Sequence, residues 1–382
     1  MSEGGVLFVD HAGVLGGAEL SLLDLSAAFG SRSEVLLLAD GPFRAALESR
    51  GVQVHVEALG ALKHVKKETR IPGPAAFADA ARIATHVAKR AKSHKVIYAN
   101  SQKAFVVAAA AGLFARRPVV WHLRDILAPP HFSGTNVRAA VTLANLRAAR
   151  VIANSRATAA AFTGAGGHES LVRVVHNGID PAPFEAVTPE RAAATRDALG
   201  LPAGAFVVSL FGRFHPWKGQ QVLLEALARL PRVHALFVGA PLFGEEAFAS
   251  ALQAHAEKTG VADRAHFLGF RTDVPELMRA SDAIVHASVY PEPFGRVIVE
   301  GMLAERPVIA TRAGGVTEII DDATGVLVPP NDAGAMAQAI ELLAGDPVHA
   351  AQLAARGAAR ARAGFSVTAM VRGVEEALRD LL

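Results

Sequence analysis

The sequence predicts an α/β protein made of two doubly wound domains with parallel sheets. Short apolar runs typical of buried strands alternate with longer runs of helical periodicity along the chain. This alternation restarts after a turn-rich segment near residue 180. At 382 residues the chain is also long for a single hydrophobic core and of ordinary length for two.

In the first half, the apolar runs predict strands at 6–10, 34–39, 52–56, 96–99, 118–123 and 149–153, and the segment 171–176 closes this half. Helical periodicity predicts helices at 20–28, 42–50, 75–92 and 104–115, the last of them buried, and another that starts after Ser155. Asn177-Gly178-Ile179-Asp180-Pro181 contains two turn dipeptides, so we expect the hinge near 178–188.

In the second half, strands are predicted at 206–211, 235–238, 265–269, 283–287, 306–310 and 324–330, and helices at 220–230, 273–280, 297–304, 332–345 and 347–363. Gly364-Phe365-Ser366 interrupts the helical pattern before a closing helix that runs to Leu382. We therefore expect three segments: a domain at 1–180, a domain at 181–364 and a terminal helix at 365–382.

The composition is that of a globular protein, with 51% hydrophobic and 20% charged residues. The chain has no cysteine, which excludes disulfides and thiolate chemistry and fits a reducing compartment. The first residues do not resemble a signal peptide, and the longest apolar run, 104–115, is too short to span a bilayer. We therefore expect a cytoplasmic protein, with peripheral contact to the inner face of the membrane as a further option.

The net charge of +3 conceals an asymmetry between the two halves. Residues 1–180 contain 21 Lys and Arg against 13 Asp and Glu, whereas the remainder contains 18 against 23. A basic half indicates an anionic partner, such as a phosphorylated acceptor, an acidic glycan or a membrane surface, or else a merely solvated face. The same alternatives apply to the basic loop predicted at Lys63–Arg70.

Two cations follow the first strand of the second half. Arg213 and Lys218 lie in the loop where that strand ends, which is where ligands bind in open α/β sheets. A guanidinium and an ammonium in such a loop suit a diphosphate, because both form charge-assisted hydrogen bonds. The alternative is a pair of solvated cations.

The segment Ser288–Glu300 joins another strand to a helix. Its prolines and Gly295 predict a stiff, tight loop, and the free N–H groups of the following helix suit a phosphate. Glu292 lies in the loop and Glu300 about one turn into the helix, so one carboxylate can reach a sugar hydroxyl and the other a ribose diol. The alternative is a Pro-rich turn followed by an amphipathic helix with two solvated glutamates.

Two features of the first half lie at comparable strand ends. The turn after the first strand contains Gly16-Gly17, but it does not fit G-x-G-x-x-G, so a dinucleotide site is not supported. His122 lies at the end of the strand predicted at 118–123. Strand ends hold sites in this topology, although a lone histidine is more often structural.

Together these motifs resemble the retaining nucleotide-sugar glycosyltransferases of glycosyltransferase family 4. Glu292 to Glu300 is similar to the Glu-x(7)-Glu motif of that family, and Arg213 with Lys218-Gly219 to its Arg-x(4)-Lys-Gly element. The resemblance covers nearly the whole chain and also includes Gly16-Gly17, His122, Asn177-Gly178-Ile179-Asp180 and Gly314-Gly315. Arg296 and Gly301 depart from it, because the family often has an apolar residue or Ala at these places.

The resemblance implies the GT-B fold, in which two Rossmann-like domains face each other across a cleft. The N-terminal domain would bind the acceptor, the C-terminal domain the nucleotide-sugar donor, and the last helix would pack back on the first domain. A hexose would pass from a nucleotide diphosphate to an acceptor hydroxyl with retention of configuration. The acceptor class implied is a glycan, lipid-linked or small molecule of cell-envelope or exopolysaccharide synthesis.

The resemblance also implies roles for single residues. Arg213 and Lys218 would stabilise the leaving diphosphate, Glu292 would bind sugar hydroxyls, and His122 would orient the sugar. Further donor contacts are implied for Gly16, Gly17, Phe270, Arg271, Phe294, Gly295, Arg296, Val297, Glu300, Gly314 and Gly315. Of these, Glu300 would bind the ribose, and Phe270 and Arg271 would contact the base through their backbone.

No cofactor or metal is expected, since the sequence lacks Asp-x-Asp and His-Glu-x-x-His and since cations and helix dipoles can carry the charge. No nucleic-acid partner is expected either. The alternatives are a non-catalytic nucleotide-sugar-binding protein and a related epimerase or phosphorylase. The missing G-x-G-x-x-G disfavours a dehydrogenase.

Overall fold

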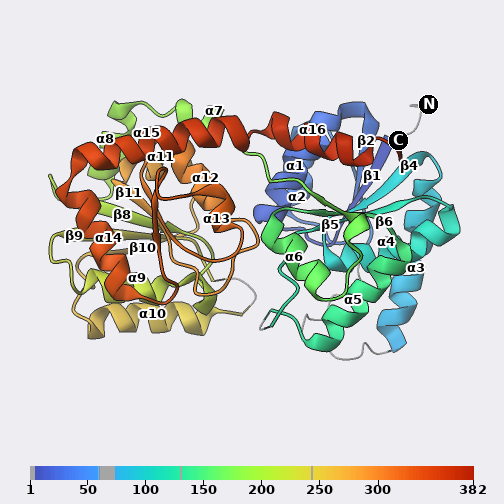
Figure 1. Ribbon diagram of the computed structural model, residues 1–382, viewed down its shortest axis with the longest axis horizontal. Helices are drawn as coiled ribbons and strands as arrows, with labels where there is room; N and C mark the ends of the chain where they lie inside the picture. Colours follow the sequence, from blue (N-terminus) through green and yellow to red (C-terminus); the bar gives the residue numbers. More distant parts are fainter. Residues whose placement is uncertain (1–4, 59, 61–73, 130, 242–243) are drawn as a thin grey trace. The chain divides into compact units, whose positions relative to one another are not determined.

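The computed structural model describes residues 5–58, 60, 74–129, 131–241 and 244–382 (Figure 1). The chain forms two compact units, Met1–Gly178 with Val367–Leu382, and Ile179–Ser366. We call them unit 1 and unit 2. The sequence placed the first boundary at 180/181 and the last at 364/365. The basic loop predicted at Lys63–Arg70 lies outside the described residues.

Unit 1 contains a seven-stranded parallel sheet in the order β3-β2-β1-β4-β5-β6-β7. Its strands are β1 Gly5–Asp10, β2 Ser33–Leu37, β3 Gln53–Val56, β4 His94–Ala99, β5 Val119–Leu123, β6 Ala148–Ala153 and β7 Val172–Val174. Its helices are α1 Gly17–Phe29, α2 Pro42–Ser49, α3 Pro74–Ala91, α4 Gln102–Ala115, α5 Gly134–Arg147, α6 Arg156–Gly164 and α16 Val367–Leu378.

Helices cover both faces of this sheet, which is why its strands are apolar along their length. Leu7 and Val9 point to the face covered by α3, α4, α5 and α6. Val6 and Phe8 point to the opposite face, where they pack with buried residues of α1, α2 and α16. The last helix of the chain therefore belongs to the core of unit 1, which holds its apolar residues Met370 and Val374.

Unit 2 contains a six-stranded parallel sheet in the order β10-β9-β8-β11-β12-β13. Its strands are β8 Phe206–Phe211, β9 Val233–Val238, β10 Ala265–Gly269, β11 Ala283–His286, β12 Val308–Thr311 and β13 Val326–Val328. Its helices are α7 Ala182–Glu185, α8 Pro189–Ala198, α9 Gln220–Leu227, α10 Glu246–Lys258, α11 Val274–Ala280, α12 Arg296–Leu303, α13 Val316–Ile319, α14 Ala333–Gly345 and α15 Pro347–Gly364.

The strand orders place one point of reversal in each unit, between β1 and β4 and between β8 and β11. In such sheets the loops that leave neighbouring strands at this point diverge to opposite faces and open a crevice for ligands. In unit 2 these are the loops that carry Arg213 and Glu292. In unit 1 they follow Asp10 and Ala99. The two doubly wound parallel-sheet domains predicted from the sequence are confirmed.

The prediction that the helix at 104–115 is buried is wrong for one of its faces. In α4, Val106 is 44%, Leu113 55% and Phe114 67% exposed. Only its inner face, including Phe105 and Ala108, lies in the core. An unbroken run of apolar residues has no periodicity that would show which face is exposed.

Candidate active site

The loop after β8 is held against the end of β11. Gly219 has a φ of 71°, and a Cβ atom there would lie 1.9 Å from the carbonyl oxygen of Ala287. The Val289 amide donates to the Trp217 carbonyl at 2.9 Å. The glycine after Lys218 is therefore required by a close backbone approach that fixes this loop beside the Glu292 segment.

The two cations predicted in this loop flank one indole ring. The Arg213 guanidinium carbon lies 5.7 Å and the Lys218 Nζ 5.8 Å from the centre of the Trp217 ring. The Gln220 side chain donates to the Arg213 carbonyl at 2.9 Å, which holds the backbone at that residue. Arg213 and Lys218 thus share one loop, at the reversal point of the sheet.

Lys218 is paired with Glu292. Its Nζ lies 3.0 Å from both carboxylate oxygens, and Ser288 Oγ donates to Oε2 at 2.8 Å. His286 Nε2 lies 3.4 Å from the same oxygen. Burial by itself raises the pKa of Glu292, but the Lys218 charge and next the His286 hydrogen bond outweigh it, so this pKa lies well below its usual range. Glu292 is therefore an ionised carboxylate that is largely buried, with 13% of its side chain exposed.

Gly314 and Gly315 position the backbone of Glu292. The Gly315 amide donates to the Glu292 carbonyl at 2.8 Å. Gly314 has a φ of 66°, and a Cβ atom there would lie 2.3 Å from the same carbonyl oxygen. Gly314 and Gly315, which were predicted to lie beside the donor, therefore have a structural role: they allow their loop to pack closely against the loop that carries Glu292.

The first turn of α12 holds a second ion pair. Arg296 Nε lies 3.4 Å from Glu300 Oε1, with their side chains 13% and 15% exposed. Arg296 departs from the family pattern, and the structure gives it a partner one helical turn away. Gly295, with a φ of 105°, precedes the helix in a conformation that favours glycine.

Four other predicted donor contacts differ in their surroundings. Phe294 is 2% exposed and packs edge-on against Phe365 at 5.8 Å, so its side chain belongs to the core. Val297 is half-buried and packs against the same core. Phe270 is 76% exposed after β10, and Arg271 forms a two-bond pair with Asp273 at 2.8 and 2.5 Å.

In unit 1, Gly16 and Gly17 begin helix α1. The Gly16 amide donates to Glu19 Oε2 at 3.0 Å, so a side chain in the first turn satisfies it. Burial raises the pKa of Glu19 to about 7, and the charge of Asp10 adds to the effect. A carboxyl group that is largely protonated below this pH therefore holds the loop after β1.

His122 lies inside β5 and is completely buried. Its Nδ1 shares a hydrogen bond with the Tyr98 hydroxyl at 2.5 Å. Among the described residues its Nε2 has no hydrogen-bond partner. Burial lowers the pKa of His122 well below its ordinary value, and the Arg124 charge acts in the same direction. The ring is therefore neutral.

A buried polar chain that the sequence analysis missed connects the strand ends of unit 1. Asn100 donates to Asp10 and accepts from Arg124 Nε at 2.7 Å, and Arg124 Nη1 donates to Asn177 at 2.8 Å. His11 Nδ1 lies 2.8 Å from Ser101 Oγ. Each of these residues directly follows an apolar run, which is the signal that could have found them.

The described part of the chain offers neither a metal-binding cluster nor a membrane-spanning helix. No group of three or more His, Cys, Asp or Glu residues there is arranged to hold a metal ion. In the same residues, no helix has the length and apolar character needed to cross a membrane.

Unit 2 thus offers cations at the point where an anionic ligand would sit in this topology, with a carboxylate that can accept from hydroxyl groups. Unit 1 offers a neutral imidazole, a protonatable carboxyl group and amide side chains. Such groups suit the recognition of a nucleotide diphosphate by one unit and of uncharged hydroxyl groups by the other.

Comparisons with known proteins agree with this arrangement. A family model described as "Glycosyl transferases group 1" matches residues 192–360, and one described as "Glycosyl transferase 4-like domain" matches residues 16–178. Anabaena HepE, solved in complex with UDP and glucose, is 41% identical, and the alignment covers 98% of this chain and 99% of that chain with a TM-score of 0.90. A structure of HepE with UDP-glucose gives 40% identity, the same coverages and a TM-score of 0.90.

A relative from Mycobacterium sp. (strain KMS), D-inositol 3-phosphate glycosyltransferase, is 38% identical over 177 residues, which is 46% of this chain and 39% of that protein. The match thus spans less than half the length of this relative. HepE is matched over nearly its whole length, and the two family models follow each other along the chain. The chain therefore belongs to the group 1 glycosyltransferases of the GT-B fold, with an N-terminal domain of the glycosyl transferase 4-like kind.

Proposed function

We propose that this protein transfers glucose or a related hexose from a UDP-sugar to an acceptor hydroxyl, with retention at the anomeric carbon. The observation that carries the proposal is the cluster of Arg213, Lys218 and Glu292 at the reversal point of the unit 2 sheet. The uridine base and the glucose are inferred from the ligands of HepE, which is similar over nearly its whole length.

In this proposal the cations stabilise the charge that grows on the departing diphosphate. Removing one such group from an active site typically lowers the rate by about a hundredfold or more. Glu292 accepts hydrogen bonds from the sugar, and Glu300 binds the ribose beside Arg296. The backbone N–H groups of the first turn of α12 face the phosphates. No divalent metal is required, because Arg213, Lys218 and the helix N-terminus supply the positive charge.

His122 supplies a neutral donor in unit 1. We assign the Tyr98 hydroxyl as the donor to Nδ1, so that Nε2 carries the ring hydrogen and remains available to a sugar oxygen. Gly17 brings a backbone N–H group to the phosphates, and Gly16 does so when its N–H leaves Glu19 Oε2. The acceptor proposed is a glycan, a lipid-linked sugar or a small hydroxylated molecule of cell-envelope or exopolysaccharide synthesis.

The first experiment compares UDP, GDP and ADP in thermal-shift measurements, each with magnesium and with EDTA, on wild type and Arg213→Ala. Ligand that binds the native state raises its melting temperature by mass action. We expect a shift with UDP alone that magnesium does not change and that the variant largely loses. A shift that appears only with magnesium would contradict metal independence. The absence of a shift with any of the three nucleotides would contradict the proposed donor site in unit 2.

The second experiment follows turnover of UDP-glucose. Release of UDP that depends on an added acceptor separates transfer from epimerisation and from a non-catalytic binding role. The anomeric proton coupling of the product, measured by NMR, then distinguishes retention from inversion.

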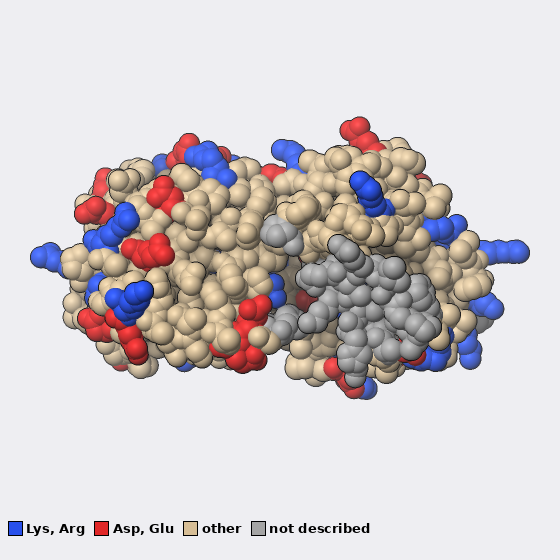
Figure 2. Space-filling view, turned by 90° about the horizontal axis from the view of Figure 1, so that it is seen from below, with Lys and Arg blue, Asp and Glu red and all other residues tan. Residues whose placement is uncertain are grey.

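A membrane surface is a second proposed partner, and a charge pattern in unit 1 favours it. Residues 80–168 contain 13 Lys and Arg and a single acidic residue, Asp125. Figure 2 shows Lys and Arg gathered at the right-hand end of the view, which is unit 1. On the outer sides of α4 and α5, Leu113, Phe114 and Leu146 are 55%, 67% and 71% exposed. Apolar side chains among cations fit an anionic lipid surface.

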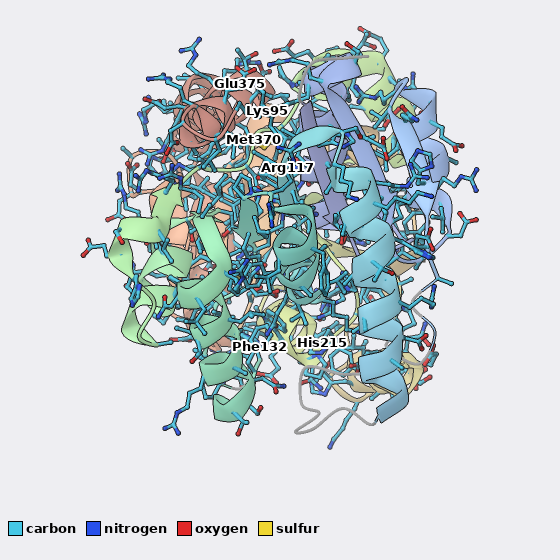
Figure 3. The ribbon with its side chains drawn as sticks, turned by 90° about the vertical axis from the view of Figure 1, so that its right-hand side faces the viewer. Lys95, Arg117, Phe132, His215, Met370 and Glu375 are labelled. Atoms are coloured by element: carbon cyan, nitrogen blue, oxygen red, sulfur yellow. The ribbon has the colours of Figure 1, made fainter. Side chains whose placement is uncertain are left out.

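This face lies toward the amino ends of the strands. Figure 3 shows Lys95, in β4, and Arg117, just before β5, at the opposite end of the unit from Phe132, which follows β5. We expect cosedimentation with vesicles that contain phosphatidylglycerol but not with pure phosphatidylcholine vesicles. Leu113→Glu with Phe114→Glu should abolish it, whereas Leu342→Glu on unit 2, where Leu342 is 49% exposed, should not. Equal binding to both vesicles would contradict an anionic surface.

A further inference from the structure

The Glu292 carboxylate has partners besides Lys218, and they are distributed unevenly between its two oxygens. Oε2 faces Lys218, Ser288 Oγ at 2.8 Å and His286 Nε2 at 3.4 Å. Among the described residues, Oε1 has only Lys218, at 3.0 Å. His286 and Ser288, 7% and 1% exposed, come from the end of β11. The sequence analysis assigned neither of them to the site.

Two interactions compete for the Lys218 ammonium: its ion pair with Glu292 and its proposed contact with the diphosphate. In the structure its ammonium contacts both oxygens of Glu292 at 3.0 Å, which neutralises most of its charge. In the proposed function the same ammonium must stabilise a diphosphate. When it turns to the phosphates, a buried carboxylate loses its cation, which is strongly unfavourable unless hydrogen bonds remain.

We propose that His286 and Ser288 are positioning residues that keep the Glu292 carboxylate oriented toward the sugar when Lys218 turns from it to the donor diphosphate. This inference rests on the proposed function. Because both residues contact Oε2, the departure of Lys218 leaves that oxygen held and vacates Oε1. The vacated oxygen then accepts a hydrogen bond from a hydroxyl of the sugar.

The surroundings make these two partners rigid. Thr311 Oγ1 donates to the Ser288 carbonyl at 2.8 Å, and His286 pairs in register with Ala310 of β12. His286 Nε2 lies 3.3 Å from Ser288 Oγ, so the three groups form one contact cluster. A ring nitrogen beside a carboxylate oxygen must carry a hydrogen to bond with it, which assigns the proton to Nε2. The cluster therefore presents two fixed donors to Oε2.

Kinetics of a graded series at residue 286 provide the first test. With UDP-glucose, we expect His286→Leu to lower kcat about tenfold while the Kd of UDP, measured by calorimetry, changes less than about threefold. UDP lacks the transferred hexose, so its binding does not need Glu292. His286→Gln, whose amide nitrogen can reach the same oxygen, should retain kcat within about threefold. His234→Leu, at the stacked His234–His266 pair in the same sheet, is the matched control.

Two results would overturn the proposal. The first is an unchanged kcat in His286→Leu. The second is an equal loss of kcat and UDP affinity that His286→Gln does not restore, since that pattern indicates a structural role alone.

A double-mutant cycle tests the proposal without turnover. Lys218→Met imitates the departure of the ammonium, and His286→Leu removes one of the remaining donors. Measured at pH 8, we expect the combined loss in Tm to exceed the sum of the single losses by about 3 °C, because the carboxylate then lacks both partners. Additive losses would contradict it. A wild type that neither binds UDP nor transfers sugar would instead refute the proposed function, and the cycle would still show whether His286 supports Glu292.

Discussion

The carboxyl edges of the two sheets have the same topology but opposite electrostatics. In unit 2, the Lys218 charge and the His286 hydrogen bond, acting against burial, hold the pKa of Glu292 well below its usual range. In unit 1, burial raises the pKa of Glu19 to about 7 and lowers that of His122 well below its usual range. One edge holds Glu292 ionised. The other holds His122 neutral and Glu19 largely protonated below pH 7, beside Asp10, whose pKa is lowered by its hydrogen bond with His11 against the effect of burial.

The cause of the difference is the neighbour of each buried group. Glu292 has an ammonium at 3.0 Å, whereas Glu19 has the like charge of Asp10 nearby and His122 has the hydroxyl of Tyr98. Cations such as Lys218 suit a diphosphate whose charge grows during the reaction, and neutral donors suit the hydroxyl groups of a sugar. The comparison teaches that one fold supports both kinds of recognition, with the choice made by two or three side chains at the strand ends.

The largest effect is expected from Lys218→Ala, which removes an ionic group from unit 2. We expect kcat/KM for UDP-glucose to fall about a hundredfold, because the leaving diphosphate loses a cation. Lys258→Ala, at an exposed position at the end of α10, controls for a general loss of charge. A fall in kcat/KM of less than about threefold would show that Lys218 does not stabilise the leaving diphosphate.

Gly219→Ala tests whether the unit 2 edge depends on its loop contact. Left-handed backbone alone costs about 1–2 kcal/mol for a non-glycine residue, and here the new Cβ would also meet the Ala287 carbonyl at 1.9 Å. In chemical denaturation, we expect the variant to lose about 3 kcal/mol or more of its free energy of unfolding. The thermal shift that UDP produces should be lost as well.

Gly204→Ala is the matched control for that variant. Its φ of 75° is close to the 71° of Gly219, but a Cβ atom there meets nothing within 4 Å. Gly204→Ala should lower the free energy of unfolding only by the backbone strain, and it should leave the UDP thermal shift unchanged. Equal effects of the two variants would show that strain, and not the approach of the loops, fixes the site.

His122→Gln tests the neutral edge. Because the folded pKa of His122 lies below its unfolded value of about 6.5, the unfolded state binds the extra proton, and stability falls as the pH drops below about 6.5. The variant should lose this part of the acid sensitivity and lower kcat about tenfold. Tyr98→Phe, which removes the partner of Nδ1, should lower kcat in the same direction. An unchanged acid dependence in His122→Gln would mean that His122 is not held neutral.

Glu19→Gln has the smallest expected effect. The folded pKa of about 7 lies above the unfolded value of 4.5, so the folded state binds more protons between these values and wild-type stability declines as the pH rises through them. From pH 5 to pH 8, urea denaturation should show the variant gaining about 1–2 kcal/mol relative to wild type. Glu169→Gln, an exposed residue of unit 1, should show no such trend. A stability difference between variant and wild type that stays constant from pH 5 to pH 8 would show that the pKa of Glu19 is not raised.

The sequence by itself determined the two parallel-sheet domains, the glycosyltransferase character with the GT-B fold, and the order of the site loops. Strands buried on both faces are apolar throughout, and β8 and β11 stand out for this reason. The prediction omitted α5, α8 and α10, whose apolar residues are few or small. In α8 only Ala192 is buried, so hydrophobic periodicity does not mark it.

Only the tertiary structure decided which side chains meet. Lys218 and Glu292 are 74 residues apart in the chain, and Asn100 and Asp10 are 90 apart, so no local pattern joins them. The same applies to Phe294, which a motif placed in the site and which packing places in the core. Local sequence fixes periodicity and turns, whereas ion pairs and pKa values depend on contacts made when strands from distant segments align.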